Sequence, residues 1–265
     1  MAKVHFIGGE KGGVGKSMTA RLLAQFHIDQ QRPFLGFDCD ASHGTFSRFY
    51  RDFAAPIIVG DEESLDGLLT VIEENPDKDL IIDLAAQTAN PIGRWIEETQ
   101  VFDLLDELGH QVYWWHVMDD GFDSVSLLAG ILEKYQAEPV SFVVVKNYGR
   151  GQNFTKFEQS PAFERALAQQ AIIIDLPKLQ TKLTQKIDFN NTSFWAVAND
   201  RSLMNIAERQ RMKVWLKNAY QSLAFLQQPT LAQSNQQDEQ PEPQPEEHVQ
   251  WQTQEVPLSH STEQH

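Results

Sequence analysis

The sequence predicts an α/β fold: a doubly wound, mostly parallel sheet flanked by helices. Short apolar runs alternate with amphipathic stretches along the chain, which is typical of βαβ units around a buried sheet. A glycine-rich loop with two lysines stands directly between the first apolar run and the first amphipathic stretch. Carboxylates follow the second and third apolar runs, and the carboxyl ends of parallel strands are where such sheets bind ligands.

The distribution of apolar residues predicts where the strands and helices lie. Strands are predicted at 4–8, 33–38, 79–83, 111–117, 140–147 and 171–175, where apolar residues run together. Helices are predicted at 17–30, 91–109, 123–136 and from about 200 to 225. Pro91 near a helix start and Gly109 at its end are typical of helix boundaries.

The chain predicts one domain over residues 1–227 and a tail over 228–265. The tail is rich in Gln, Pro and Glu and has too few apolar residues to offset the entropy lost on ordering, so we expect it to be disordered. The net charge is −15, and the tail carries seven of the 37 acidic residues and none of the 22 basic ones, which leaves the body at −8. An acidic body repels polyanions, so any nucleic-acid contact needs a local basic patch.

Composition also excludes several classes of protein. A single cysteine, Cys39, excludes an internal disulfide and a four-thiolate metal site. No run approaches the ~18 apolar residues of a membrane span, and the first residues have a strand pattern rather than that of a signal peptide. We therefore expect a soluble cytoplasmic protein without a membrane association.

The glycine-rich loop KGGVGKS, residues 11–17, predicts a phosphate-binding site. Between a strand and a helix, glycine amides can surround phosphate oxygens, and the helix N-terminus favours an anion. Lys16 would reach the β and γ phosphates, and the Ser17 hydroxyl would bind Mg²⁺. Glu10 stands where the strict pattern has its first glycine, and the alternative is a turn with two solvated lysines. The residues expected to contact nucleotide here are Gly12, Gly13, Val14, Gly15, Lys16, Ser17 and Met18.

Asp83 ends the apolar run DLIID and would hold Mg²⁺ through a water molecule, since this ion prefers oxygen ligands and keeps much of its hydration. Asp38 and Asp40 follow the preceding strand, and the alternative for this pair is that both acids cap a turn. His116 is expected to be a core histidine. The acids of the segment MDDGFDS, Asp119, Asp120 and Asp123, are expected to cap a helix.

The loop resembles the deviant Walker A motif, K-G-G-x-G-K-[ST], of the MinD and ParA family of P-loop ATPases, which belongs to the SIMIBI class. The resemblance covers about residues 1–225 and implies that ATP and Mg²⁺ are bound and that the ATP-bound form is a homodimer. It also implies that Lys11 crosses to the phosphates of the partner subunit. A cation at that position would offset the repulsion between two facing nucleotides and stabilise the transferring phosphoryl group.

Other segments extend the resemblance to the remaining site residues. GFDCDASHGTF, residues 36–46, resembles the family's switch I segment, although Ala41 and Ser42 replace a common Pro-Gln. The resemblance implies that Asp40 orients or activates the attacking water and that Asp38 lies near the Mg²⁺ shell, so that Lys11, Lys16 and Asp40 are the implied catalytic residues. Two later segments resemble the adenine end of the site, which implies that Asn147 reads the base and Pro177 covers it.

Within this family the chain looks most like plasmid-encoded ParA relatives linked to stability, partition and conjugative transfer. The leading hypothesis is an ATPase whose slow hydrolysis times a switch between a monomer and a DNA-associated dimer that positions plasmid DNA, with a plasmid-encoded partner protein. The alternative is an ATP-gated adaptor for conjugative transfer or another assembly that does not bind nucleoid DNA. A weaker third option is a small-molecule ligase or synthetase on the same fold.

The last predicted helix carries the candidate DNA-binding residues. The basic side chains are Arg201, Arg209, Arg211, Lys213 and Lys217. The alternative is an ordinary solvated helix face, because helices often carry this many charges. If the patch binds DNA, the affinity should fall steeply with salt through counterion release.

Overall fold

The computed structural model describes residues 2–227 except 10, 41–43, 60, 61 and 87. The tail predicted over 228–265 lies outside the described residues, as do Glu10 and the switch I residues Ala41 and Ser42. None of the described helices combines the length and the apolar run that crossing a lipid bilayer requires.

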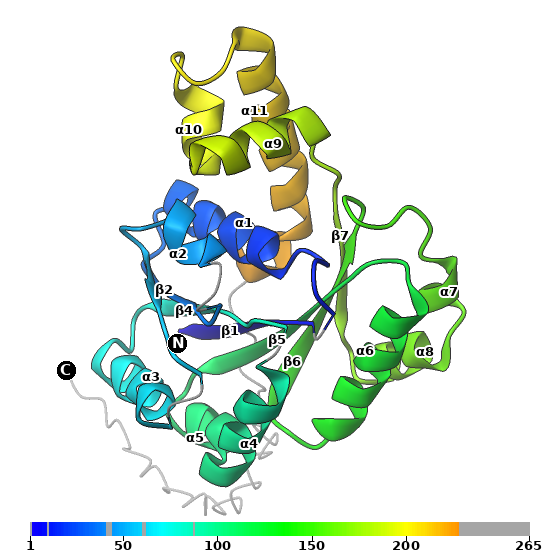
Figure 1. Cartoon of the computed structure of the whole chain (residues 1–265). Helices are drawn as coiled ribbons and strands as arrows, with labels where there is room; N and C mark the ends of the chain where they lie inside the picture. The colour runs from blue at the N-terminus through cyan, green and yellow to red at the C-terminus, as the bar shows by residue number, and fades with distance from the viewer. Residues whose placement is uncertain (1, 10, 41–43, 60–61, 87, 228–265) are drawn as a thin grey trace, which may run out of the picture. The chain divides into compact units, whose positions relative to one another are not determined.

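A parallel sheet of seven strands forms the centre of the described chain (Figure 1). Its spatial order is β3-β2-β4-β1-β5-β6-β7, and each neighbouring pair is parallel. The strands are β1 (Lys3–Gly8), β2 (Phe34–Asp38), β3 (Ala54–Pro56), β4 (Asp79–Asp83), β5 (Gln111–Met118), β6 (Val140–Asn147) and β7 (Ile172–Leu176). In register, Asp83 lies opposite both Ile7 of β1 and Asp38 of β2, so the carboxylates that follow β2 and β4 meet at the edge where β1 ends.

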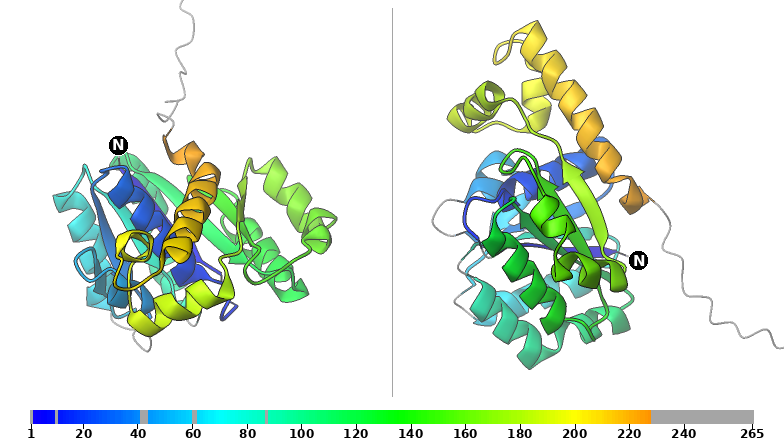
Figure 2. Two further views of the ribbon diagram at one scale, coloured as in Figure 1. Left: turned by 90° about the horizontal axis from the view of Figure 1, so that it is seen from above. Right: turned by 90° about the vertical axis from the view of Figure 1, so that its right-hand side faces the viewer.

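Helices cover both faces of the sheet (Figures 1 and 2). One face carries α1 (Lys16–Asp29), α2 (Thr45–Phe49), α9 (Thr181–Asn190), α10 (Phe194–Asn199), α11 (Ile206–Ser222) and the 3-10 turn η1 (Ala224–Gln227). The other face carries α3 (Glu62–Glu74), α4 (Ala89–Thr99), α5 (Val101–Glu107), α6 (Phe122–Lys134), α7 (Thr155–Glu158) and α8 (Pro161–Ala168).

Alternate residues of β1 enter the two apolar cores that lie on either side of the sheet. Ile7 packs into the core under α1, whereas Val4 and Phe6 pack into the core over α4 and α5. This alternation follows from the two-residue period of a strand buried on both faces. The predicted doubly wound α/β fold is therefore confirmed.

Two predicted helices differ from the structure. The stretch 91–109 forms two helices rather than one, because Gln100 has a φ of 48° and its left-handed backbone ends α4 before α5 begins. The final helix begins only at Ile206, where Asn205 and Glu208 form a capping box, and it ends at Ser222. The strand β3 and the short helices α2, α7 and α10 carry too few residues for a periodic signal.

Candidate phosphate-binding site

The loop between β1 and α1 has the backbone that only glycine adopts readily. Gly13 and Gly15 have φ values of 78° and 108°, and Gly15 is the N-cap residue of α1. A Cβ at Gly15 would lie 2.3 Å from Nδ2 of Asn147, so a side chain there is excluded by contact as well. Among the described residues no side chain caps the first turn of α1, which leaves its backbone amides free to bind an anion.

Lys16 is the buried cation of the loop. Its side chain is 8% exposed, and its ammonium donates to the carbonyl oxygen of Lys11 at 3.2 Å. Burial lowers the pKa of Lys16, while the negative charges of Asp83 and Asp40 raise it. The ammonium is therefore held against the loop, and the charges of the carboxylates after β4 and β2 act on it. Its contact with phosphate stays a prediction.

Asp83 is a buried carboxyl group whose pKa is raised above its ordinary value. Neither of its oxygens meets a donor at normal hydrogen-bond geometry among the described residues. Burial raises its pKa to about 7, against the lowering effect of the nearby Ser17 hydroxyl, and the neighbouring Asp38 raises it further. Two side chains that can supply oxygen ligands to a metal, Asp83 at the end of β4 and Ser17 at the start of α1, thus lie together. This donor set fits Mg²⁺, which takes oxygen ligands.

Asp38 is fully buried and holds the start of α2. One oxygen accepts the backbone amide of Asp40 at 3.0 Å, and the other accepts the amides of Phe46 and Ser47 at 2.9 and 2.8 Å and the Ser47 hydroxyl at 3.1 Å. The alternative that an acid caps a turn is thus realised at Asp38. Its place in a Mg²⁺ shell stays a prediction, with four protein donors already on its oxygens.

Asp40 lies in the loop between the end of β2 and the start of α2. It is partly buried, and its backbone carbonyl accepts the amide of Gly44 at 2.8 Å. Its negative charge raises the pKa of Lys16, against the larger lowering effect of burial. The role of Asp40 in orienting the attacking water stays a prediction.

Lys11, the second lysine of the loop, is paired within its own chain. Its ammonium lies 2.8 Å from one oxygen of Asp119 and 3.2 Å from the other, and this hydrogen bond raises the pKa of Lys11. The Asp119 carboxylate also accepts the Gly121 amide at 3.1 Å and the Ser124 hydroxyl at 2.7 Å. It is not the predicted helix cap, because Gly121 is the N-cap residue of α6 and has no side chain. A cross-subunit role for Lys11 requires that this ion pair open.

Asn147 binds the loop itself. Its amide nitrogen donates to the carbonyl oxygen of Val14 at 2.7 Å, and its amide oxygen accepts the Gly149 amide at 2.9 Å. The side chain therefore ties the end of β6 to the phosphate-binding loop, which sequence reasoning missed because the contact joins residues 133 positions apart. Its role in reading a base stays a prediction.

Pro177 lies beside a cavity of about 340 Å³ between the end of β7 and α11. Its carbonyl oxygen accepts the indole nitrogen of Trp215 at 2.8 Å, and Arg211 and Leu179 also line the cavity. A cavity at this strand end is compatible with the predicted adenine side of the site. Contact between Pro177 and a base stays a prediction.

No family model matches the chain. Protein TraL of Escherichia coli is 30% identical over 237 residues, which cover 84% of this chain and 98% of TraL. The chain belongs to the TraL family. Protein MobD of Acidithiobacillus ferrooxidans is 22% identical over 80% of this chain and 94% of MobD.

A solved structure shows the fold of this TraL-family chain. MinD in the MinC:MinD cell division complex of Aquifex aeolicus superposes with a TM-score of 0.50 and 11% identity, over 83% of this chain and 96% of that chain. At this identity the likeness shows the fold alone, which is the MinD-like P-loop NTPase fold. The fold part of the resemblance drawn from the loop is thereby confirmed.

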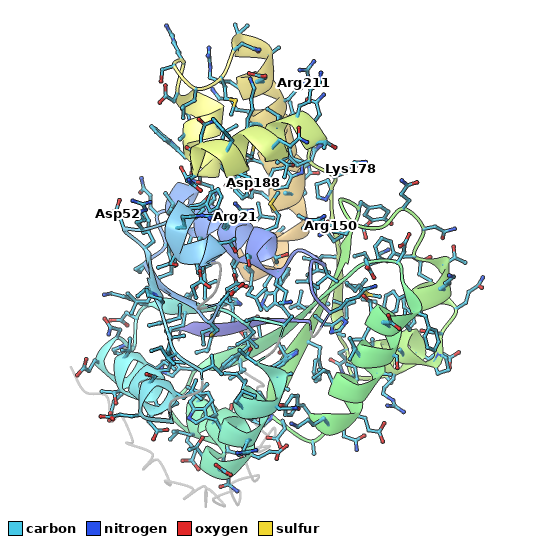
Figure 3. The ribbon with its side chains drawn as sticks, viewed as in Figure 1. Arg21, Asp52, Arg150, Lys178, Asp188 and Arg211 are labelled. Atoms are coloured by element: carbon cyan, nitrogen blue, oxygen red, sulfur yellow. The ribbon has the colours of Figure 1, made fainter. Side chains whose placement is uncertain are left out.

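Arg21 is a site residue of the TraL-family chain that the sequence analysis did not single out. It lies one turn after Ser17 on α1, is 7% exposed, and stacks over the ring of Phe49 at 4.2 Å. Its guanidinium lies 3.7 Å from Asp188 of α9, and Figure 3 shows the two side chains between these helices. Its positive charge also lowers the pKa of Asp83. An arginine within the apolar stretch TARLLA was the available signal.

The basic residues of the C-terminal helix do not form one face in the TraL-family chain. Arg209, Lys213 and Lys217 follow at intervals of four, so they share a side of α11, and both lysines are exposed. Arg211 is exposed but lines the cavity beside Pro177, and Arg209 donates to the Met204 carbonyl at 2.6 Å. Arg201 is exposed in the preceding loop. Contact between these five residues and DNA stays a prediction.

A buried polar cluster at the opposite end of β4 could also hold a cation by its residue types. His5, His27 and Asp79 bring their ligand atoms within 4.8 Å of one another. The hydrogen bonds oppose a metal, because the Trp115 indole donates to Nδ1 of His5 at 3.1 Å, which directs the ring proton to the other nitrogen. Arg32 also donates to Asp79 at 3.1 Å. We interpret this cluster as structural.

His116 confirms a smaller prediction. It is 2% exposed in β5, and its Nε2 lies 3.0 Å from the carbonyl oxygen of Ser124. Burial lowers the pKa of His116 to about 4, so the ring is neutral at physiological pH. The residue is a core histidine that ties β5 to α6.

Proposed function

We propose that this TraL-family chain is a Mg²⁺-dependent ATPase that binds ATP, hydrolyses it slowly and acts as a nucleotide-controlled switch in conjugative transfer. The observation that carries the proposal is the buried Lys16 ammonium, which donates to a glycine loop at a helix N-terminus and interacts electrostatically with the buried Asp83 carboxylate. The MinD-like fold and the deviant Walker A pattern support nucleotide as the ligand. The relation to TraL and MobD supports the transfer role over the partition role that led the sequence analysis.

Each residue has a distinct task in this proposal. The amides of residues 12–17 and the ammonium of Lys16 bind the phosphates, and this pairing of donors with an anion stabilises the charge that develops during phosphoryl transfer. Ser17 would hold Mg²⁺ directly and Asp83 would hold it through a water molecule, and the ion would neutralise phosphate charge. Asp40 orients the attacking water.

The proposed ATPase domain comprises residues 1–227. We expect the protein to be located in the cytoplasm.

The ATP-bound form is proposed to be a homodimer in which Lys11 reaches the phosphates of the partner subunit. Two triphosphates brought face to face repel each other, and a cation between them offsets that repulsion. In the described conformation Asp119 holds Lys11 by an ion pair, so nucleotide binding and dimer formation have to displace Asp119 with phosphate. A plasmid-encoded partner protein would then recognise the dimer.

The dimer is tested by replacing Asp40. Asp40→Ala is expected to bind ATP as the wild type does and to accumulate as a dimer with Mg²⁺ and ATP, because the attacking water is no longer activated. Light scattering after size exclusion measures the mass with ATP and with ADP. The control is Asp52→Ala, which removes an exposed acid close to α2. A mass that stays monomeric in saturating ATP, for both the variant and the wild type, would disprove the ATP-dependent dimer.

A second candidate function, DNA association by the dimer, is favoured by the spacing of Arg209, Lys213 and Lys217 on one side of α11. The double variant Lys213→Ala with Lys217→Ala is expected to weaken ATP-dependent retention on DNA and to lower the salt slope by roughly one for each lost phosphate contact. ATP affinity should not change. The matched control is Lys78→Ala with Lys156→Ala, which removes the same charge away from α11. Equal retention of the two double variants would exclude this surface and favour the adaptor alternative.

A further inference from the structure

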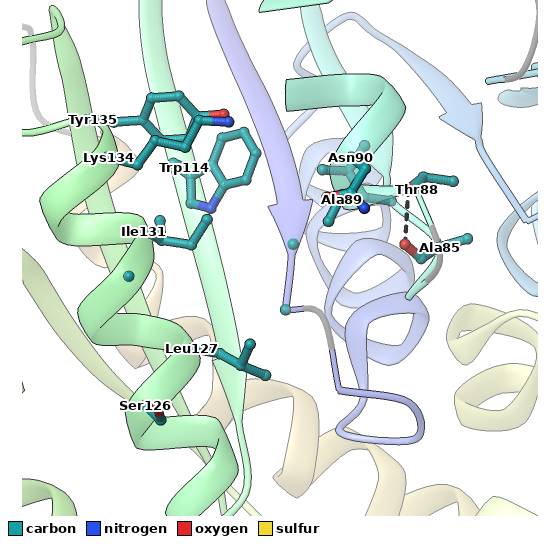
Figure 4. A pocket seen from close by; sticks show the side chains of 14 residues that line it. Ala85, Thr88, Ala89, Asn90, Trp114, Ser126, Leu127, Ile131, Lys134 and Tyr135 are labelled. Carbon is teal, nitrogen blue, oxygen red and sulfur yellow. Dashed lines mark hydrogen bonds between the residues drawn. The ribbon is translucent and has the colours of Figure 1, made fainter. Parts of the chain in front are cut away.

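A second cavity lies on the opposite face of the sheet, between α4 and α6. Its volume is about 280 Å³, and it opens beside the carboxyl ends of β1 and β4 (Figure 4). None of the residues assigned above to nucleotide or Mg²⁺ lines it. Leu84 and Ala85 close one side, Leu127 and Ile131 of α6 close the other, and Trp114 of β5 forms the inner end.

Trp114 lines this cavity and carries a buried hydrogen-bond donor, its indole N–H. The residue is 5% exposed, and its indole nitrogen has no acceptor among the described residues. The ring stacks on Phe6 at 5.9 Å and contacts Tyr135 at 5.2 Å between centroids, so its direction is fixed. Figure 4 shows the nitrogen edge of the ring turned toward the space that separates α6 from α4. A buried indole N–H of this kind calls for an acceptor atom.

Two features that favour an anion, the Lys134 ammonium and the start of α4, lie at the border of the cavity. Lys134 is the one charged residue among those that line it, and its ammonium at the rim pairs with exposed Glu97 at 2.8 Å. Ala89 and Asn90, the first two residues of α4, also line it, and a helix N-terminus favours an anion. The Thr88 hydroxyl donates to the Ala85 carbonyl at 2.8 Å and does not cap the helix.

One glycine leaves room for a ligand body. A Cβ at Gly130 of α6 would meet no atom within 4 Å among the described residues, so the helix presents open space at this position. The apolar side chains beside it are Leu127 and Ile131. The cavity therefore offers an apolar surface, a fixed N–H donor and an ammonium at one end, which together match a compact molecule with an apolar body and one anionic oxygen group.

We propose that this cavity binds a small organic monocarboxylate. One carboxylate oxygen accepts the indole N–H of Trp114, the charge is balanced by Lys134 and the start of α4, and the apolar body lies against Leu127 and Ile131. The inference does not depend on the proposed nucleotide binding, because the two sites share no residue. It adds a second class of ligand, at a cavity that is lined by Leu84, the residue after Asp83.

The test is a titration of the full chain, labelled with ¹⁵N at tryptophan, with hexanoate and benzoate and with the matched neutral amides. The indole signal of Trp114 is identified by its loss in Trp114→Phe. We expect that signal to shift saturably with a carboxylate and at least tenfold more weakly with the corresponding amide. Absence of a saturable shift for either acid, or equal affinity for acid and amide, would overturn the proposal.

A cavity-filling variant locates the site. Gly130→Leu is expected to abolish the carboxylate shift, because the new side chain occupies the space in which the apolar body lies. The matched control is Gly67→Leu on α3, another helical glycine whose Cβ would meet no atom within 4 Å. It should leave the carboxylate affinity unchanged. A carboxylate shift that survives in Gly130→Leu would place the ligand elsewhere, and ATP titrations of both variants keep this outcome separate from the nucleotide proposal.

Discussion

Lys16→Ala is expected to weaken binding of ATP with Mg²⁺ by at least about 100-fold, which corresponds to roughly 2.7 kcal/mol. The buried ammonium already faces the loop and the carboxylates, so it is positioned for phosphates before they arrive. No other lysine in the described part of the chain is placed to replace it, because Lys11 is bound to Asp119. Isothermal titration calorimetry with a non-hydrolysable ATP analogue measures the loss.

In the absence of nucleotide, we expect the free energy of unfolding of Lys16→Ala to be close to that of the wild type. Burial lowers the pKa of Lys16, which means that the charged form is held at a cost in the folded protein. Lys156→Ala is the control, because that lysine is exposed on α7. Equal ATP affinity for the wild type and Lys16→Ala would remove the phosphate-binding assignment of the loop.

Asp83→Asn is expected to stabilise the nucleotide-free protein at pH 8 while abolishing the effect of Mg²⁺ on ATP binding. Burial raises the pKa of Asp83 from its ordinary value of 3.8 to about 7, so at pH 8 the folded protein carries a buried charge there that the unfolded chain exposes to water. Three pKa units correspond to roughly 4 kcal/mol, and an amide recovers only part of this because its own N–H groups need acceptors, so we expect about 2 kcal/mol.

The sign of the pH dependence follows from the raised pKa. The protonated carboxyl contributes stability that is fully present below about pH 3.8 and is lost as the pH rises through about 7. The free-energy advantage of Asp83→Asn over the wild type should therefore be largest at pH 8 and should vanish near pH 4. Urea unfolding at the two pH values measures this difference. An advantage that is equal at pH 4 and pH 8 would contradict the raised pKa.

The matched control lies at the other end of the same strand. Burial alone would raise the pKa of Asp79, but the hydrogen bond from His27, the two neighbouring histidines and the backbone amide of Lys3 lower it to about 2. The charged Asp79 contributes stability above its ordinary pKa that is lost only as the pH falls through about 2. Asp79→Asn should therefore cost about 3 kcal/mol at pH 8 and should not alter the effect of Mg²⁺ on ATP binding. One strand thus carries two buried carboxylates with opposite effects on stability.

The parts of this molecule that sequence reasoning predicted are those with a local signal. The alternation of apolar runs predicted six of the described strands, and the glycine loop placed Lys16 and Ser17 at a helix start. The break at Gln100 has no such signal, because no glycine or proline marks it. An unmarked change of backbone direction is set by packing against the sheet, which a sequence window does not contain.

The contacts that organise the site are mostly long-range. Asn147 holds the loop from β6, Asp119 holds Lys11 from the end of β5, and Arg21 reaches Asp188 of α9. Each pair depends on the order of strands in the sheet and not on spacing along the chain. Residue types therefore predicted which groups would meet at this edge, while the partner that each group takes became visible only in the fold.

The ion pair between Lys11 and Asp119 has a consequence for when two subunits can recognise each other. Because Lys11 already has an ion-pair partner in its own subunit, contact with a second subunit that holds no polyphosphate would add little binding energy. Collisions between nucleotide-free subunits would then not give stable dimers, even at high protein concentration. A stable dimer would form only after both subunits had bound nucleotide.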